Sequence, residues 1–188
     1  MLNEPLTKNI TNLRSAVVTI FSDLGSGSGF FVNKDGYLLT NHHVAGSTKF
    51  VKVKLSTGRE LVGEVISFDK TRDVALIKTE QIAVQPMAIR VSEPNIGEEV
   101  YVLGSPLGDK FNTTLTKGIL SGYRTLKEQR YLQSDVTILP GNSGGPLLDA
   151  KGSVIGMTVA GLGAKGLAGM NFFIPINEVL TKLGVELQ

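Results

Sequence analysis

The sequence predicts an all-β protein of two small barrels, with a short helix at each end of the chain. Three observations support this. The 22 glycines of the 188 residues separate short runs rich in Val, Ile, Leu, Phe and Thr, as in barrels and sandwiches. Helical periodicity is confined to the two ends. Residues 86–94 lack periodicity and contain two prolines, which predicts a connector. We therefore divide the chain into 1–80, helix and first barrel; 81–98, connector; and 99–188, second barrel and helix.

Each barrel is expected to contain six strands. Asp35-Gly36 and Thr57-Gly58 are typical of turns between neighbouring strands. The predicted strands are runs of β-branched, aromatic and other apolar residues between such turns: 16–21, 29–33, 37–40, 50–55, 60–68 and 74–78 in the first half, and 99–103, 113–120, 131–135, 146–148, 153–159 and 171–174 in the second.

The terminal helices follow from apolar spacing and capping residues. Apolar residues at i, i+4 and i+7 predict a helix over residues 6–13, with Asn3 as its N-cap and Pro5 in its first turn. Near the other end, Asn177 is the expected cap and Gly184 the expected stop of a second helix. Its apolar face carries Val179, Leu180 and Leu183.

Composition excludes several classes of protein. Hydrophobic residues make up 41% of the chain and charged residues 19%, so the chain can bury a core. The net charge is +2 and the basic residues are scattered, which argues against a nucleic-acid partner. The absence of cysteine excludes disulfides, thiolate zinc sites and a cysteine nucleophile. No apolar run approaches the roughly 20 residues that span a bilayer.

The compartment is left open by the sequence. The first ten residues lack a basic segment followed by an apolar core, the pattern of a secretion signal. A periplasmic or other extracytoplasmic location would follow if a signal had been removed, and a cytoplasmic one otherwise.

The strongest local signal is Gly-Asn-Ser-Gly-Gly-Pro at residues 141–146. A serine hydroxyl attacks a carbonyl only if a base takes its proton and nearby donors stabilise the oxyanion. The amides of Gly141 and Ser143 are expected to point toward one spot, and Gly141 tolerates dihedral angles that a Cβ would oppose. The alternative is a glycine-rich hairpin with an incidental serine.

The candidate base and its orienting carboxylate each have two possibilities. The only histidines are His42 and His43, and histidine is the usual base near neutral pH. On extended backbone neighbouring side chains point to opposite sides, so one of them at most should face a shared cleft. Asp73 opens a strongly apolar strand and is the preferred carboxylate. Asp69 is the competitor, but it lies in a turn with Arg72 that reads as solvated.

These segments together resemble trypsin-like serine proteases, specifically the protease domain of the HtrA/Deg family. The resemblance rests first on TNHHV, DVALIK and GNSGGP, which place His, Asp and Ser in the family's order, and it extends over roughly residues 10 to 182. Four further segments match in the same order: GSGFFV at 27–32, DGYLLT at 35–40, LGSPLG at 103–108 and FFIP at 172–175.

The resemblance implies a chymotrypsin-like fold of two six-stranded antiparallel barrels and a serine endopeptidase that needs neither metal nor cofactor. Alignment with the family motif places the base at His43 and leaves His42 in a variable position. His43 then takes the proton of Ser143, Asp73 orients the imidazole, and the Gly141 and Ser143 amides hold the oxyanion. Unfolded or extended protein segments are the expected substrates.

The resemblance also implies residues of the substrate pocket. Thr137, six residues before the nucleophile, stands where a preference for Lys or Arg would require Asp. The other pocket residues are apolar or small, which favours an uncharged aliphatic side chain before the scissile bond. They are Ile138, Leu139, Val159, Ala160 and Gly161.

Three expectations concern assembly and activity. Family members usually carry PDZ domains after the protease domain, and this chain reads as a protease domain without one. Family trimers are held by aromatic residues near the N-terminus, and residues 1–15 contain none, so a monomer is favoured and a trimer is the alternative. The alternative function is a latent, chaperone-like or regulatory module that holds extended polypeptides while its triad stays misassembled. A resting form of the protease, with the Pro140–Gly141 peptide misoriented until substrate binds, is a separate possibility.

Overall fold

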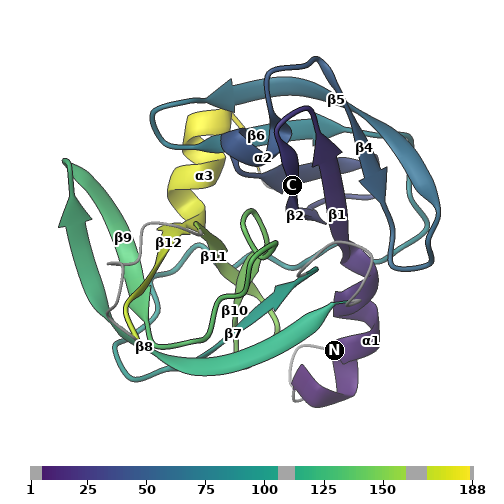
Figure 1. Ribbon diagram of the computed structural model, residues 1–188. Coiled ribbons are helices and arrows are strands. Elements are labelled where there is room, and N and C mark those ends of the chain that lie inside the picture. The colour runs from purple at the N-terminus through teal and green to yellow at the C-terminus, as the bar shows by residue number, and fades with distance from the viewer. Residues whose placement is uncertain (1–5, 106–112, 160–168, 187–188) are drawn as a thin grey trace.

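The computed structural model describes residues 6–105, 113–159 and 169–186, and its strands form two closed antiparallel barrels lying side by side (Figure 1). This confirms the predicted fold class. Neighbouring strands pair in the spatial orders β1-β2-β3-β6-β5-β4 and β10-β11-β12-β9-β8-β7. Both rings close through pairs distant in sequence, β1 with β4 and β7 with β10.

The first barrel encloses an apolar core supplied by alternate residues of its strands. Val51 and Val53 point inward from β4 while Phe50 and Lys52 are exposed, which is the period-two pattern of a half-buried strand. Phe31, Leu38 and Ile77 are fully buried in the same cluster. In spatial order, the strands are β1 (Val17–Ser22), β2 (Gly25–Phe31), β3 (Tyr37–Thr40), β6 (Val74–Lys78), β5 (Glu60–Asp69) and β4 (Phe50–Lys54).

The second barrel is built in the same way. Val102 pairs with Leu147 where β7 and β10 close the ring, and both side chains are fully buried. Leu120 and Phe173 complete much of its core. In spatial order, the strands are β10 (Pro146–Asp149), β11 (Val154–Thr158), β12 (Asn171–Pro175), β9 (Gln129–Ser134), β8 (Thr114–Leu126) and β7 (Glu99–Gly104).

The β8–β9 hairpin is longer than predicted. The expected strand ended at residue 120, whereas β8 continues to Leu126 and pairs with β9 to its end. Lys127 and Glu128 form the turn with φ of 47° and 64°, as in a two-residue hairpin. This turn lacks the Asn or Gly that such a conformation favours, and Arg124 and Thr125 are exposed, so neither turn chemistry nor burial identified the strand.

The two terminal helices pack on the barrels and join them. Helix α1 (Leu6–Ala16) buries Leu6 and Leu13 in a cluster that also contains residues of both barrels. Helix α3 (Ile176–Leu183) follows the second barrel directly but packs against β5 and β6 of the first (Figure 1). Residue 16 was expected in a strand and instead ends α1.

The limits of α3 were predicted correctly at one end only. Gly184 stops the helix with φ of 66°, as expected. Asn177 is not the cap, because the helix already begins at Ile176, after Pro175. The Asn177 side chain accepts only the N–H of the next residue, at 3.0 Å. The proline ring fixes the φ of Pro175 in a range that can precede a helix, and proline has no N–H that needs a hydrogen-bond partner. These two properties explain why α3 begins earlier than the sequence predicts.

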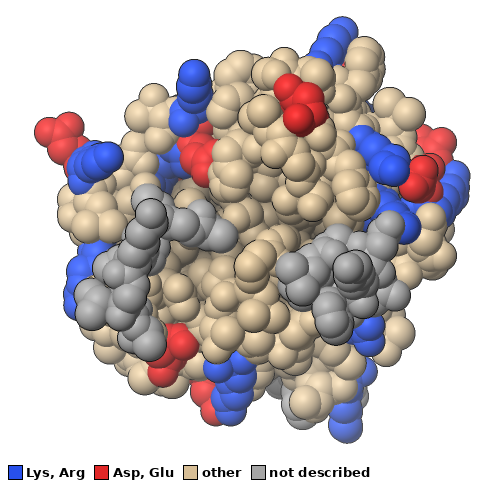
Figure 2. Space-filling view, viewed as in Figure 1, with Lys and Arg blue, Asp and Glu red and all other residues tan. Residues whose placement is uncertain are grey.

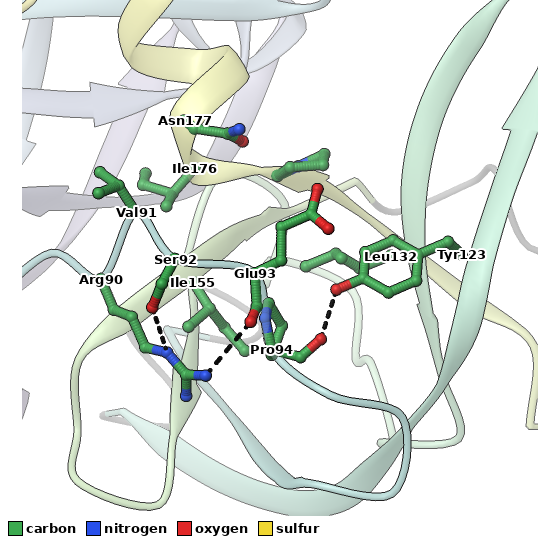
Figure 3. A pocket seen from close by; sticks show the side chains of 11 residues that line it. Arg90, Val91, Ser92, Glu93, Pro94, Tyr123, Leu132, Ile155, Ile176 and Asn177 are labelled. Carbon is green, nitrogen blue, oxygen red and sulfur yellow. Dashed lines mark hydrogen bonds between the residues drawn. The ribbon is translucent and has the colours of Figure 1, made fainter.

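The connector is fastened to the second barrel around Arg90. Its Nη1 forms ion pairs with Glu98 at 2.8 Å and Asp149 at 3.3 Å. The hydrogen bond from Arg90 lowers the pKa of Glu98 to about 2. In Figure 3 the guanidinium also meets Ser92 and the main chain of Glu93, while Tyr123 donates its hydroxyl to the Pro94 carbonyl. These contacts hold residues 90–94 against β8 and β10 of the second barrel.

Charges are mixed on the face shown in Figure 2, where basic and acidic side chains lie mainly around the edge. Within the described residues, no helix combines the length and hydrophobicity needed to cross a membrane.

Candidate active site

His43 and Asp73 meet at the edge of the first barrel. His43 lies on the one-turn helix α2 (His42–Ala45) and Asp73 directly precedes β6. The Asp73 Oδ2 lies 2.7 Å from His43 Nδ1, and Oδ1 accepts the main-chain N–H of His43 at 2.9 Å. The two side chains are 48% and 27% exposed, so solvent and substrate can reach the imidazole. Two contacts to one carboxylate fix both the ring and the backbone that carries it.

Asp73 holds an uncommon backbone conformation. Its φ is 63°, in the left-handed region that costs a residue with a side chain of order 1–3 kcal/mol and persists only where the surroundings impose it. Asn41, which is fully buried, donates from Nδ2 to the Asp73 carbonyl at 3.0 Å and to Met157 Sδ at 3.4 Å. Asn41 therefore ties α2, the Asp73 turn and β11 together. The motif TNHHV contained this residue, but its type alone suggested no role.

The two histidines diverge for a reason other than the one expected. Residues 42–45 form a helical turn rather than extended backbone, so neighbouring side chains are separated by the helical rotation. His42 stacks on Phe68, with ring centroids 4.7 Å apart and planes at 18°. The structure thus places His43 against Asp73 and His42 against β5.

Among the described contacts, Asp69 forms no hydrogen bond or ion pair with either histidine. Its Oδ1 accepts the N–H of Arg72 at 2.7 Å, within the turn that it opens. The structure brings Asp73, and not Asp69, to His43.

The Ser143 turn is clamped by Ser28 of the other barrel. Ser28, fully buried on β2, donates its N–H to the Ser143 carbonyl at 2.8 Å and its hydroxyl to the Gly141 carbonyl at 2.6 Å. The same hydroxyl accepts the N–H of Ser105 at 2.9 Å. On the far side, Gly144 donates to the carbonyl of Thr158 on β11 at 3.0 Å. Ser28 was noted only as part of a matching segment, and its role requires the packed barrels.

This clamp brings the Ser143 turn against α2. A methyl group on Gly27 would lie 2.5 Å from Val44 Cγ2 and 3.0 Å from the Ser143 carbonyl oxygen. One on Gly144 would lie 3.0 Å from the N atom of Asn41. Asn41 and Val44, which lie before and after His43 in the chain, are therefore near the segment that carries Ser143, whose own exposure is 7%.

Residues 139–142 form a turn with a defined central peptide. The N–H of Asn142 donates to the Leu139 carbonyl at 3.0 Å, and Gly141 has φ of 96°. A positive φ at the third position is the signature of a type II turn, whose central amide is oriented opposite to that of type I. Among the described residues, no acceptor is bonded to the Gly141 N–H.

The predicted pocket residues are only partly described. Thr137 is exposed, and its carbonyl accepts the hydroxyl of Thr116 at 2.7 Å. Ile138 and Leu139 are half-buried, and Val159 is buried at the end of β11. The remaining two, at positions 160 and 161, lie outside the described residues.

The surroundings of His43 include an open groove along the first barrel. An open groove of about 700 Å³ begins there and follows the first barrel past Leu24, Phe68 and Lys49. In residues 6–105, 113–159 and 169–186, no three His, Asp or Glu side chains gather as a set of metal ligands.

Known proteins with similar sequences and structures are proteases. Residues 27–157 match the trypsin-like peptidase domain family. A probable periplasmic serine endoprotease, DegP-like, from Hahella chejuensis is 41% identical over 165 residues, covering 82% of this chain and 34% of the relative. Protease Do-like 1, chloroplastic, from Arabidopsis thaliana is 34% identical over 194 residues, covering 94% of this chain and 44% of the relative.

A solved structure extends this similarity to the whole fold. The crystal structure of the serine endoprotease from Yersinia pestis has a TM-score of 0.82 and 27% identity, and the match covers 96% of this chain and 66% of that one. The chain spans about a third of the DegP-like relative, so the similarity concerns its protease domain. With two chymotrypsin-like barrels and a family match over most of its length, the chain belongs to the trypsin-like peptidase family and is similar to its HtrA/DegP-like members.

Proposed function

We propose that this domain is a serine endopeptidase that hydrolyses unfolded or extended polypeptides. The observation that carries the proposal is the pair of contacts that the Asp73 carboxylate accepts from the main-chain N–H and Nδ1 of His43, on a helix that lies near the Ser143 turn. A carboxylate bonded to Nδ1 keeps the proton on that nitrogen and leaves Nε2 free to act as a base.

The proposed reaction has two halves. Ser143 Oγ attacks the scissile carbonyl carbon while His43 Nε2 takes the hydroxyl proton and then gives it to the leaving amine. Water next attacks the acyl-enzyme, with His43 again as the base, and the acid product is released. Asp73 remains ionised throughout and stabilises the imidazolium that forms.

The oxyanion is assigned to the N–H groups of Gly141 and Ser143. Two features support the assignment: the type II turn that defines the Pro140–Gly141 peptide, and the Ser28 hydroxyl on the Gly141 carbonyl. Donors that are fixed before the reaction need no reorganisation as charge develops, and each is typically worth about 2.7 to 4 kcal/mol.

Extended polypeptide is the substrate class we assign to this site. A strand added along residues 159–161 would be bound mainly through its main chain. The groove beside His43 offers room for the rest of the segment, with Leu24 and Phe68 as apolar contacts.

We expect the active unit to be a monomer, and light scattering of the wild-type protein distinguishes it from a trimer.

Cleavage is expected after small or medium uncharged aliphatic residues. Thr137 carries no charge, and the nearby Asp135 turns its Oδ1 to the N–H of Ile119 at 2.8 Å, on β8. Ile138, Leu139 and Val159 supply apolar surface, with Ala160 and Gly161 completing the proposed wall. A profile against a peptide library with varied residues before the scissile bond tests this. Dominant cleavage after Lys or Arg would contradict it.

The proposed activity is tested with wild type and Ser143→Ala. Near pH 8, wild type should degrade unfolded casein and become labelled by a fluorophosphonate, and the variant should lose both, since removing the nucleophile of such an enzyme costs about 10⁶-fold in kcat. Unchanged melting temperature is the control. Wild type that binds casein without cleavage or labelling would instead favour the latent, chaperone-like module.

A further inference from the structure

The turn that carries Asp73 contains a buried arginine. Arg72 lies in the turn at residues 69–73 between β5 and β6, directly before Asp73, and its side chain is 2% exposed. The sequence suggested a solvated turn here, and for Arg72 that was wrong. A buried guanidinium is retained only where partners compensate its desolvation, so its contacts show what holds the turn.

The described partners of the Arg72 side chain belong to the second barrel and to α3. Its Nη1 donates to Gln129 Oε1 at 2.9 Å, and its Nη2 donates to the Arg130 carbonyl and pairs with Glu178 Oε2 at 2.7 Å. The guanidinium carbon lies 4.6 Å from the ring centre of Tyr131, a cation–π contact. One side chain of the first barrel thus binds both β9 and α3.

Other contacts support the same turn. Gln129 returns a hydrogen bond from Nε2 to the Thr71 carbonyl at 3.1 Å. Lys182 on α3 lies 4.0 Å from Asp69 Oδ2, at the start of the turn. The turn before Asp73 is therefore bound from the second barrel through the Thr71 carbonyl and the Arg72 side chain, while Asn41 donates to the Asp73 carbonyl.

We propose that Arg72 is a positioning residue that holds Asp73 in the orientation required by His43 and keeps it in register with the Ser143 barrel. This inference rests on the proposed function for its catalytic consequence, but its structural content is independent of it. Asp73 has a φ of 63°, a sparsely populated conformation that its surroundings help to maintain. Without Arg72, the backbone can relax and turn the carboxylate away from His43 Nδ1.

The test compares Arg72→Met, which keeps the length of the side chain but loses its charge and donors, with Arg72→Lys and Arg90→Met. Arg90 is also ion-paired, with Glu98 and Asp149 instead of the Asp73 turn, so its variant controls for general loss of stability. We expect Arg72→Met to lower kcat on an unfolded substrate about 10- to 100-fold with KM nearly unchanged. Arg72→Lys should recover part of kcat, because an ammonium can retain the Glu178 pair but not the whole fork.

A second readout does not depend on activity. The chain has only two histidines, so ¹⁵N-histidine labelling gives a simple spectrum in which the Nδ1-protonated tautomer of His43 can be followed. We expect that tautomer to dominate in wild type and Arg90→Met and to be mixed in Arg72→Met. Unchanged kcat and tautomer in folded Arg72→Met would overturn the inference.

The remaining outcomes are also decisive. If Arg72→Met does not fold, Gln129→Ala, which removes one acceptor of Arg72 and the bond to Thr71, should change kcat and the tautomer in the same direction; no change would overturn the inference. If wild type itself neither cleaves nor labels, the proposed function fails, and the tautomer comparison alone decides the role of Arg72.

Discussion

Asp73→Asn is expected to lower kcat about 10⁴-fold near neutral pH while leaving the fold intact, by analogy with the triad aspartate of trypsin-like enzymes. Asp73 accepts hydrogen bonds from His43 Nδ1 and from the His43 main-chain N–H. An asparagine can keep the second by its oxygen, but its NH₂ group then faces Nδ1 and favours the wrong imidazole tautomer. The base would be lost without loss of packing.

Single-turnover phosphonylation of Ser143 by a fluorophosphonate and steady-state hydrolysis of casein measure this effect. Asp35→Asn is the matched control, because Asp35 lies exposed in the β2–β3 turn and the same chemical change there should leave kcat within about threefold. A kcat for Asp73→Asn within tenfold of wild type, at equal melting temperature, would remove Asp73 from the proposed triad.

Gly144→Ala is expected to abolish labelling of Ser143, with a loss of at least about 100-fold in rate, and to destabilise the fold by more than about 3 kcal/mol. Gly144 has φ of 82°, and a methyl group there would lie 2.3 Å from both the Ser28 carbonyl oxygen and Thr40 Oγ1. These atoms belong to the tightly bonded strands β2 and β3, so the Ser143 turn must move instead. A shift of about 1 Å at a reacting group is enough to cost 10²-fold.

Gly58→Ala separates backbone strain from this collision. Gly58 has a similar φ of 88°, but a methyl group there meets nothing within 4 Å. Gly58→Ala should lower the free energy of unfolding by about 1–2 kcal/mol and leave the labelling of Ser143 unchanged. Urea unfolding gives the two stabilities, and labelling rates give the effect on the site. Equal labelling of the two alanine variants would show that the close packing of Gly144 does not position Ser143.

The fold class could be read from local features because each strand is a short apolar run between turn residues. The same features could not supply the order of strands within each ring. Strand β6 lies between β3 and β5, and each barrel closes through strands far apart in sequence. Turn residues specify only which neighbours along the chain can form hairpins, whereas closure depends on all six strands packing together.

The site was predicted unevenly for the same reason. The glycines around Ser143 mark this turn in the sequence. The family resemblance selected His43 over His42, whereas strand alternation could not choose between the two histidines. Side chains at 42 and 43 do not alternate as on a strand, because residues 42–45 are helical. Ser28 and Asn41 looked ordinary in sequence, and their importance comes from contacts made across the barrels.

The burial of Arg72 could not be predicted from the residues around it in the sequence. A turn of charged and polar residues is predicted to be exposed to solvent. Whether one of its side chains is buried depends on which distant segments pack over the turn. Its acceptors on β9 come 57 and 58 residues later, and Glu178 lies later still. Strand and turn propensities are properties of short segments, as is the glycine-rich setting that makes Ser143 a candidate nucleophile, so the amino-acid sequence alone could indicate them. Strand order and the pairing of His43 with Asp73 depend on contacts between distant parts of one barrel, and the burial of Arg72 depends on contacts with the second barrel and α3, so only the folded structure could show them.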